Sequence, residues 1–212
     1  VSSDGHVVTA LALLLESSDL RAVTHDGHVY RATVACRDNN RQLALLKLEG
    51  HPRNVDTDAP VREQMAPALF EPFSLDETSE VRAGDWVLTA GNPFKVAEGD
   101  EPMSIMKGIV SGRAPMDAAR GVQPFPYRGE ILLLDAITSG PGSAGSAVID
   151  LSGRLVGVTG KPVTSQLTNT LLNYAYPVEE IRGLIRDAAQ GKTSATQPAV
   201  AARVPGYHGI QL

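Results

Sequence analysis

Apolar residues along this chain gather in short runs, and many of the runs alternate with polar residues or are rich in β-branched side chains. Glycine, proline, asparagine and aspartate, which favour turns, lie between the runs. This pattern predicts strands over residues 20–24, 29–37, 43–48, 84–91, 104–111, 130–136, 147–150 and 155–159. The Asp26-Gly27 pair between the first two runs is a strong signal for a β-hairpin.

Helical spacing of apolar residues occurs near the end of the chain, at Val178, Ile181, Leu184, Ile185 and Ala188. Pro177 before this run and Gly191 after it are typical of the start and the end of a helix. We therefore predict a helix over 178–191. A shorter apolar run at 10–15 predicts a helical turn that faces the core. Many short strands followed by one helix predict an all-β barrel or sandwich.

The composition of the chain argues against several classes of function. The chain has 212 residues, 42% of them hydrophobic, which is enough for one large domain or two small ones. Its net charge of −5 argues against non-specific binding of nucleic acid, which requires dense positive charge. The single cysteine, Cys36, excludes an internal disulfide and a multi-cysteine metal site. No apolar run approaches the roughly 20 residues needed to cross a bilayer, and residues 1–5 lack a signal-peptide pattern.

Four segments, in this order, carry a resemblance to a known family. They read Asp-Gly-His-Val-Val-Thr at 4–9, Leu-Ala-Leu-Leu-Lys at 43–47, Val-Arg-Ala-Gly-Asp-Trp-Val-Leu-Thr-Ala-Gly-Asn-Pro-Phe at 81–94 and Pro-Gly-Ser-Ala-Gly at 141–145. Together they resemble the trypsin-like serine proteases of the HtrA/Deg family. The resemblance implies an all-β, chymotrypsin/trypsin-like double six-stranded β-barrel with a C-terminal helix and a groove between the barrels.

The resemblance also implies a division of the chain. We expect an N-terminal barrel over 1–77, with its first strand truncated and an insertion at the polar, proline-bearing segment 51–67. A C-terminal barrel over 78–177 and the helix over 178–191 follow. Residues 192–212 are then a linker and the start of a PDZ-like domain. Trp86, at the start of a predicted strand, is expected to pack inside the second barrel.

Three positions decide the expected chemistry. Where the family places its histidine, aspartate and serine, this chain has Ala12, Gln42 and Ala144. Ala144 offers no nucleophile, Ala12 offers no base and Gln42 is neutral, so acyl transfer through these positions has no route. The expectation is therefore a catalytically inactive member, a pseudoprotease, that is not an enzyme.

The turn around Ala144 is the expected oxyanion loop and groove wall, formed by Gly142, Ser143, Gly145 and Ser146. Two alternatives stay open for it: amide groups that point at a bound carbonyl, or a closed β-turn. A displaced nucleophile at Ser143 or Ser146 would give a weak serine endopeptidase, but it would lack a base. His6 is interpreted as a half-buried strand residue.

Three functions follow as hypotheses. The first is a peptide-binding, scaffold or regulatory module whose partner is an extended peptide or a protein such as an active paralogue. The second is the weak serine endopeptidase, and the third is a purely structural domain that serves the PDZ-like region. The resemblance implies an extracytoplasmic location. We expect no cofactor and no metal, since His25 and His28 are interpreted as part of a solvated turn.

Overall fold

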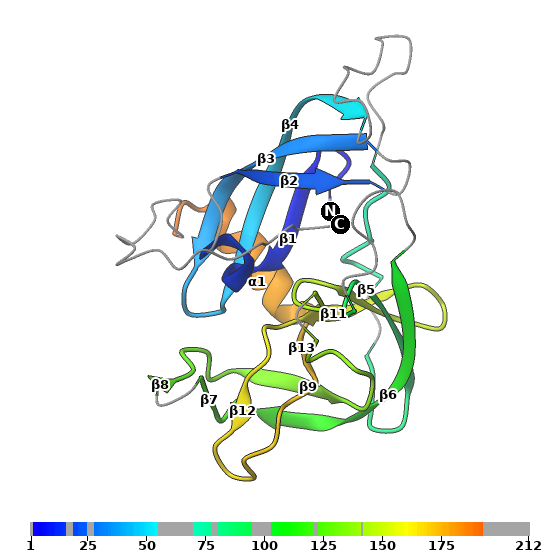
Figure 1. Ribbon diagram of the computed structural model, residues 1–212, viewed down its shortest axis with the longest axis vertical. Helices are drawn as coiled ribbons and strands as arrows, with labels where there is room; N and C mark the ends of the chain where they lie inside the picture. Colours follow the sequence, from blue (N-terminus) through cyan, green and yellow to red (C-terminus); the bar gives the residue numbers. More distant parts are fainter. Residues whose placement is uncertain are drawn as a thin grey trace.

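The computed structural model of the chain describes residues 2–15, 19–24, 28–54, 70–77, 80–94, 103–120, 123–140 and 142–192. Two β units lie one above the other in Figure 1, with the C-terminal helix packed where they meet. The all-β fold with a C-terminal helix is thereby confirmed. The hairpin turn at 25–27, most of the predicted insertion (55–67) and the expected PDZ-like start lie outside the described residues.

The first unit is an antiparallel sheet with the strand order β1-β4-β3-β2. Its strands are β1 (His6–Ala10), β2 (Leu20–Val23), β3 (His28–Asp38) and β4 (Leu43–Asn54), and the 3₁₀ helix η1 (Leu11–Leu15) follows β1. One face buries an apolar core that includes Val7, Leu14 and Leu46. Within the described ranges this unit has four strands rather than the expected six, and β4 extends into the segment interpreted as an insertion.

The second unit is a closed barrel with the strand order β10-β11-β13-β9-β6-β5. Its strands are β5 (Trp86–Gly91), β6 (Ser104–Pro115), β9 (Glu130–Leu134), β10 (Ala147–Asp150), β11 (Leu155–Thr159) and β13 (Tyr174–Pro177). Val87, Val110, Leu132 and Val148 fill its interior. A small three-stranded sheet, β12-β7-β8, was not predicted: β7 (Ala118–Arg120), β8 (Gln123–Pro124) and β12 (Thr164–Ser165) are too short to leave a pattern.

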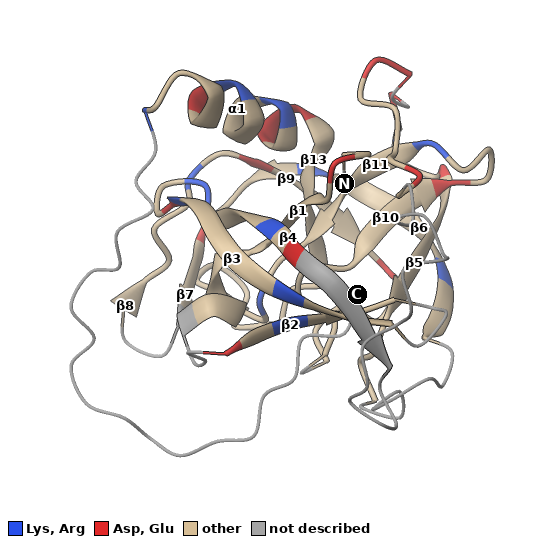
Figure 2. Ribbon diagram, turned by 90° about the horizontal axis from the view of Figure 1, so that it is seen from above, with Lys and Arg blue, Asp and Glu red and all other residues tan. Residues whose placement is uncertain are grey.

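The C-terminal helix α1 (Val178–Ala189) begins after Pro177, as the sequence predicts. Glu179 and Glu180 in its first turn and Arg186 in its last turn match the helix dipole. Figure 2 shows these acidic and basic residues along the exposed length of α1. Gly191 takes a positive φ of 66° just after the helix, which is the usual C-terminal signal.

A third apolar core joins the two units. Cys36 and Leu45 from the first sheet pack with Tyr176 from the barrel and Leu184 from α1. Cys36 is buried, in agreement with a structural thiol. Burial raises the pKa of the Tyr176 hydroxyl well above its ordinary value. The two units are therefore held together mainly by apolar contact.

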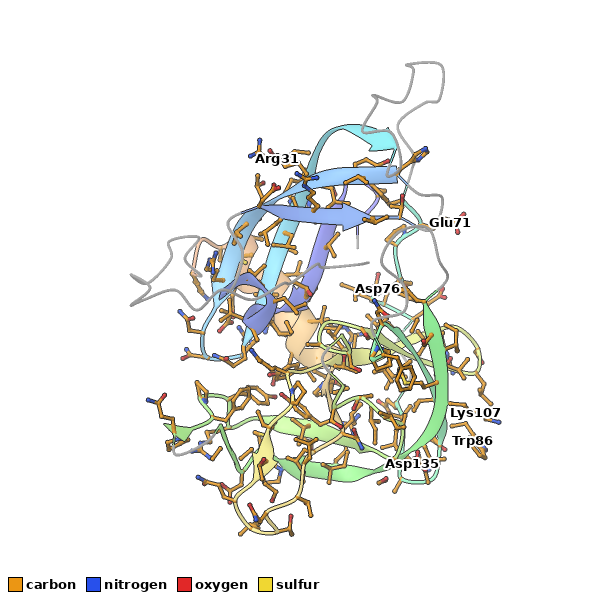
Figure 3. All side chains as sticks on the ribbon, in the orientation of Figure 1. Arg31, Glu71, Asp76, Trp86, Lys107 and Asp135 are labelled. Atoms are coloured by element: carbon orange, nitrogen blue, oxygen red, sulfur yellow. The ribbon has the colours of Figure 1, made fainter. Side chains whose placement is uncertain are left out.

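Trp86 is not in the barrel interior, and that prediction is wrong. Its side chain is 50% exposed. The Lys107 ammonium lies 3.9 Å from the centre of its ring, so the two form a cation–π pair on the outer surface of β5 and β6 (Figure 3). Alternation along β5 points Val87 inward, which leaves Trp86 outside.

Candidate functional site

A cavity of about 910 Å³ lies between the two units. Its walls come from β1, from the 142–147 segment, from β11 and from α1. Apolar side chains such as Val8, Leu155, Val158 and Ile181 make up much of the lining. A site with this size and lining is suited to apolar side chains of a ligand.

The turn at 142–146 forms the polar wall of this cavity. Gly145 takes a positive φ of 84°, a conformation that favours glycine. The amide of Gly145 donates to the carbonyl of Thr159 at 2.9 Å, and the amide of Ser146 donates to Thr159 Oγ1 at 3.0 Å. The Thr159 hydroxyl in turn donates to the carbonyl of Ser143. Thr159 thus fixes the shape of the turn from the neighbouring strand.

Two amides of this turn are left unengaged. The amide of Ser143 donates to the carbonyl of Gly140 at 3.1 Å. In contrast, the amides of Gly142 and Ala144 have no acceptor among the residues that the structure describes. Both residues line the cavity. That these amides point at a bound carbonyl, the first of the two alternatives for this turn, remains a prediction.

The structure brings the three triad-matching positions to one region. The amide of Leu11 donates to the carbonyl of Gln42 at 2.9 Å, which joins the start of η1 to the turn before β4. A Cβ atom on Gly145 would overlap the Thr9 hydroxyl and lie 3.2 Å from Leu13 Cδ1. The turn beside Ala144 therefore lies close to residues that precede and follow Ala12 in the sequence. Their role as former catalytic positions remains a prediction.

None of these three side chains brings an ionisable group to the cavity. Ala12 is buried within η1. Gln42 has a φ of 59°, and its carboxamide donates to the carbonyl of Asn39 in its own turn at 2.6 Å. Ala144 lines the cavity with a methyl group. The chemistry available at these positions is van der Waals contact and main-chain hydrogen bonding.

The two serines beside Ala144 differ in accessibility. Ser143 is 0% exposed, and its Oγ has no hydrogen-bond partner among the described residues. Ser146 is 9% exposed and lines the cavity. It lies against Gly91, and a Cβ atom on Gly91 would overlap the Oγ of Ser146. Of the two, only Ser146 faces the cavity.

Sequence reasoning missed the grouping around His6. His6 lines the cavity, and its Nδ1 lies 3.0 Å from Asp4 Oδ2. Lys47 Nζ lies 3.1 Å from the same carboxylate oxygen. Hydrogen bonds from the Ser2 hydroxyl, from His6 and from Lys47 hold the pKa of Asp4 well below its usual range. The Asp-x-His spacing at the start of β1 was the signal in the sequence.

The described part of the chain contains no group of three or more histidine, cysteine, aspartate or glutamate side chains placed to hold a metal ion. His25 lies outside the described residues, so the pairing of His25 with His28 is not observed. Within those residues no helix is long and apolar enough to cross a lipid bilayer.

Comparison with known proteins places the chain in a family. The family model of the trypsin-like peptidase domain matches residues 1–158. The chain belongs to this trypsin-like peptidase family. Serine protease HTR4 of Rattus norvegicus is 28% identical over 187 residues, which cover 88% of this chain and 32% of the relative. A probable periplasmic serine endoprotease DegP-like of Brucella suis is 29% identical over 158 residues, which cover 74% of this chain and 26% of the relative.

Solved structures support the same fold for this trypsin-like domain. The MamO protease domain from Magnetospirillum magneticum superposes with a TM-score of 0.63 at 21% identity and covers 87% of this chain and 84% of that one. The HtrA-type protease AlgW with a decapeptide gives a TM-score of 0.62 at 20% identity, over 91% of this chain and 50% of that one. The chain spans about a third of the length of the curated relatives it matches first.

These findings correct one expectation. The sequence-based conclusion that the protein is not an enzyme is contradicted, because the family is a peptidase family and the relatives are named serine proteases and endoproteases. That conclusion rested on Ala12, Gln42 and Ala144 alone. The identity of three side chains does not decide what other groups in the same cavity do, and His6, which pairs with Asp4, and Ser146 are such groups.

Proposed function

We propose that this HtrA-type domain binds extended polypeptide segments in the cavity between its two units and acts as a scaffold or regulatory module outside the cytoplasm. The observation that carries the proposal is the cavity wall at 142–146, where the amides of Gly142 and Ala144 are unengaged among the described residues. Periplasmic relatives support the location, and AlgW with its decapeptide supports the ligand class.

The geometry suits a peptide more than a polar small molecule. Unengaged amides bind carbonyl oxygens, which every peptide group supplies. The apolar lining on β11 and α1 then accepts side chains. Binding of this kind requires main-chain donors and apolar walls, and it does not require a nucleophile at Ala144. A protein partner, including an active paralogue, would be bound through the same contacts.

Binding of an unfolded substrate tests the proposal. We expect fluorescently labelled, reduced and carboxymethylated casein to bind with a Kd in the micromolar range, measured by anisotropy. Ala144→Phe, which fills the cavity beside the free amides, should weaken binding at least about tenfold, or about 1.4 kcal/mol. Ala114→Phe is the matched control, since Ala114 is equally half-buried on β6 but does not line the cavity.

Two results would contradict peptide binding. The first is no anisotropy change at concentrations up to about 100 µM, a binding free energy weaker than about −5.5 kcal/mol. The second is an equal loss of affinity in both phenylalanine variants. The first result would favour the purely structural role, and the second would place the bound peptide outside this cavity.

A second candidate function is a serine endopeptidase that uses displaced residues. Membership of the peptidase family favours it, as does the placement of His6, paired with Asp4, on the same cavity as Ser146. A histidine hydrogen-bonded to a carboxylate is the arrangement that activates a hydroxyl nucleophile. Ser143 is excluded from this role because its hydroxyl is fully buried and does not line the cavity.

Cleavage of casein and labelling by a fluorophosphonate probe test this second function. Labelling that is lost in Ser146→Ala and in His6→Gln, but kept in Ser152→Ala on the exposed β10–β11 turn, would establish it. Absence of labelling in the wild-type protein, with casein binding intact, would leave peptide binding without turnover.

A further inference from the structure

A second cavity, of about 720 Å³, lies on the other side of the contact between the two units. Residues 37–41 at the end of β3, the 126–129 segment before β9 and the end of α1 form its walls. Unlike the first cavity, its lining is dominated by charged and amide side chains. Neither the resemblance nor the proposed peptide binding assigns a role to it.

The residues that line this cavity include four cations, Arg37, Arg41, Arg128 and Lys192, and two carboxylates, Asp38 and Asp187. Arg41 engages both carboxylates, at 2.6 Å from Asp38 Oδ2 and 2.7 Å from Asp187 Oδ2, and a third one on Glu180 at 3.0 Å. With Glu180 and with Asp117, the partner of Arg128, the charges of this region balance. Arg37 is therefore distinguished by its burial and its lack of a hydrogen-bond partner among the described residues, and not by a surplus of positive charge.

Arg37 is the unusual member of this group. It is only 8% exposed, and its Nε and Nη1 atoms are buried without an acceptor among the described residues. Burial without a partner lowers the pKa of its guanidinium from the ordinary value. A buried cation that lacks a counter-charge destabilises the protein, and a bound anion would offset that cost.

The backbone explains why Arg37 is held there. The register of β3 against β4 shifts between Val34 and Cys36, and Arg37 then pairs with Ala44. The shift directs Cys36 into the core between the units, and the next residue therefore points to the opposite face. Arg37 is thus fixed by a strand rather than by a loop, which is a preorganised geometry for binding.

We propose that this cavity is a binding site for a small oxoanion, which binds to the guanidinium of Arg37, the least exposed cation of its lining. A guanidinium presents its donors in a planar fork that matches phosphate and carboxylate groups. Arg128 pairs loosely with Asp117 at 3.4 Å, and both side chains are about half exposed. Arg128 and Lys192 then add positive charge at the mouth of the site.

Titration with inorganic phosphate tests the site in the whole chain. We expect saturable binding by calorimetry at low ionic strength and a melting temperature that rises with phosphate concentration. Sodium chloride at matched ionic strength should not reproduce the rise. Acetate and O-phosphoserine, titrated in parallel, distinguish a carboxylate from a phosphate ester as the preferred form of the oxoanion.

Three variants make the test specific. Arg37→Gln should weaken phosphate binding at least about tenfold and abolish the phosphate-dependent rise in melting temperature. Arg31→Gln is the matched control and should behave as the wild type, because Arg31 is an exposed arginine on the same strand and lies at the far end of the first unit in Figure 3. Arg37→Lys, which keeps the charge but removes the fork, should bind more weakly than the wild type.

The unliganded variants supply the folding control. Without phosphate, Arg37→Gln should melt at or above the wild-type temperature, since it removes an unpaired buried charge. The proposal is overturned if phosphate, acetate and phosphoserine all fail to bind saturably, or if Arg37→Gln binds phosphate as tightly as Arg31→Gln. Should Arg37→Gln not fold, Arg37→Lys with wild-type affinity would also overturn it.

Discussion

Gly145 of the second unit packs directly against the hydroxyl of Thr9 in the first, so closely that a Cβ atom on the glycine would overlap that oxygen. Its positive φ of 84° adds a second constraint on the same residue. The turn that carries Ala144 therefore packs closely against β1. This close packing, and with it the geometry of the cavity, requires glycine at residue 145.

Gly145→Ala should destabilise the protein through both constraints. We expect a loss of about 2 to 4 kcal/mol in the free energy of unfolding, which combines left-handed strain with overpacking. Gly153→Ala is the control, because Gly153 has a similar φ of 79° and nothing within 4 Å of its Cβ position. That variant should lose only about 1 to 2 kcal/mol. Equal losses in urea denaturation would show that the contact with Thr9 carries no energy.

Ser143→Ala should leave the protein as stable as the wild type or slightly more stable. The Ser143 hydroxyl is buried without a partner among the described residues, so its removal costs no hydrogen bond there and relieves a desolvated polar group. Thermal unfolding measures the effect. A loss above about 1 kcal/mol would mean that this hydroxyl makes a hydrogen bond in solution.

Arg41→Ala should weaken the attachment of α1. The side chain is partly buried and joins Asp38 on the first unit to Glu180 and Asp187 on the helix. We expect a loss of about 1.5 to 3 kcal/mol, the range for hydrogen bonds to charged groups. Arg21→Ala removes an exposed pair with Asp19 and should cost less than about 1 kcal/mol. The two losses, compared by urea denaturation, would be equal if Arg41 made only surface contacts.

Asp187 should contribute to stability in a pH-dependent manner. The hydrogen bond from Arg41 lowers its pKa from the ordinary value of 3.8, so the folded state favours the carboxylate. Its contribution is present above about pH 3.8 and is lost as the pH falls through the lowered pKa of the folded state. In Asp187→Asn, the decline in melting temperature between pH 5 and pH 2 should be shallower. Parallel curves for the two proteins would contradict this linkage.

Introducing the family's side chains at residues 12, 42 and 144 should increase nucleophilic reactivity only in combination. Ala144→Ser alone lacks the family's histidine at residue 12, so we expect little gain in labelling by a fluorophosphonate probe over the wild type. Together with Ala12→His and Gln42→Asp, labelling should rise on the order of a hundredfold, the contribution of a positioned general base. The triple variant's circular dichroism spectrum serves as its folding control. A folded triple variant without a gain would show that residues 12, 42 and 144 do not meet as a triad.

Local patterns were enough to predict most of the strands and the helix, because alternation in β2 and helical spacing at Val178 and Ile181 are properties of short segments. The position of Trp86 could not be predicted in the same way. Its face depends on the register of β5, and the apolar residue that enters the barrel is Val87. The strands β7, β8 and β12 are held by contacts with one another, which no short segment records.

The two candidate sites differ in the same way: one could be found from a short segment of the sequence and the other could not. The turn at 142–146 was found from its own residues and their resemblance to a family. In contrast, the cavity that holds Arg37 joins residues from β3, from the 126–129 segment and from the end of α1, which lie far apart in the sequence. A single arginine in a strand gives no sign that its guanidinium is buried without a partner. Such sites emerge only from tertiary structure.

The closed order of the second barrel also sets a sequence of events for a growing chain. Among the strands of this barrel β13 comes last in the sequence, and it pairs with β11 on one side and β9 on the other. Until residues 174–177 leave the ribosome, the remaining strands can form only an open sheet, β11-β10-β5-β6-β9, with two unpaired edges. The barrel can therefore close only after β13, the strand directly before α1, has been synthesised (Figure 1). During that interval the nascent protein is most exposed to strand pairing with other chains.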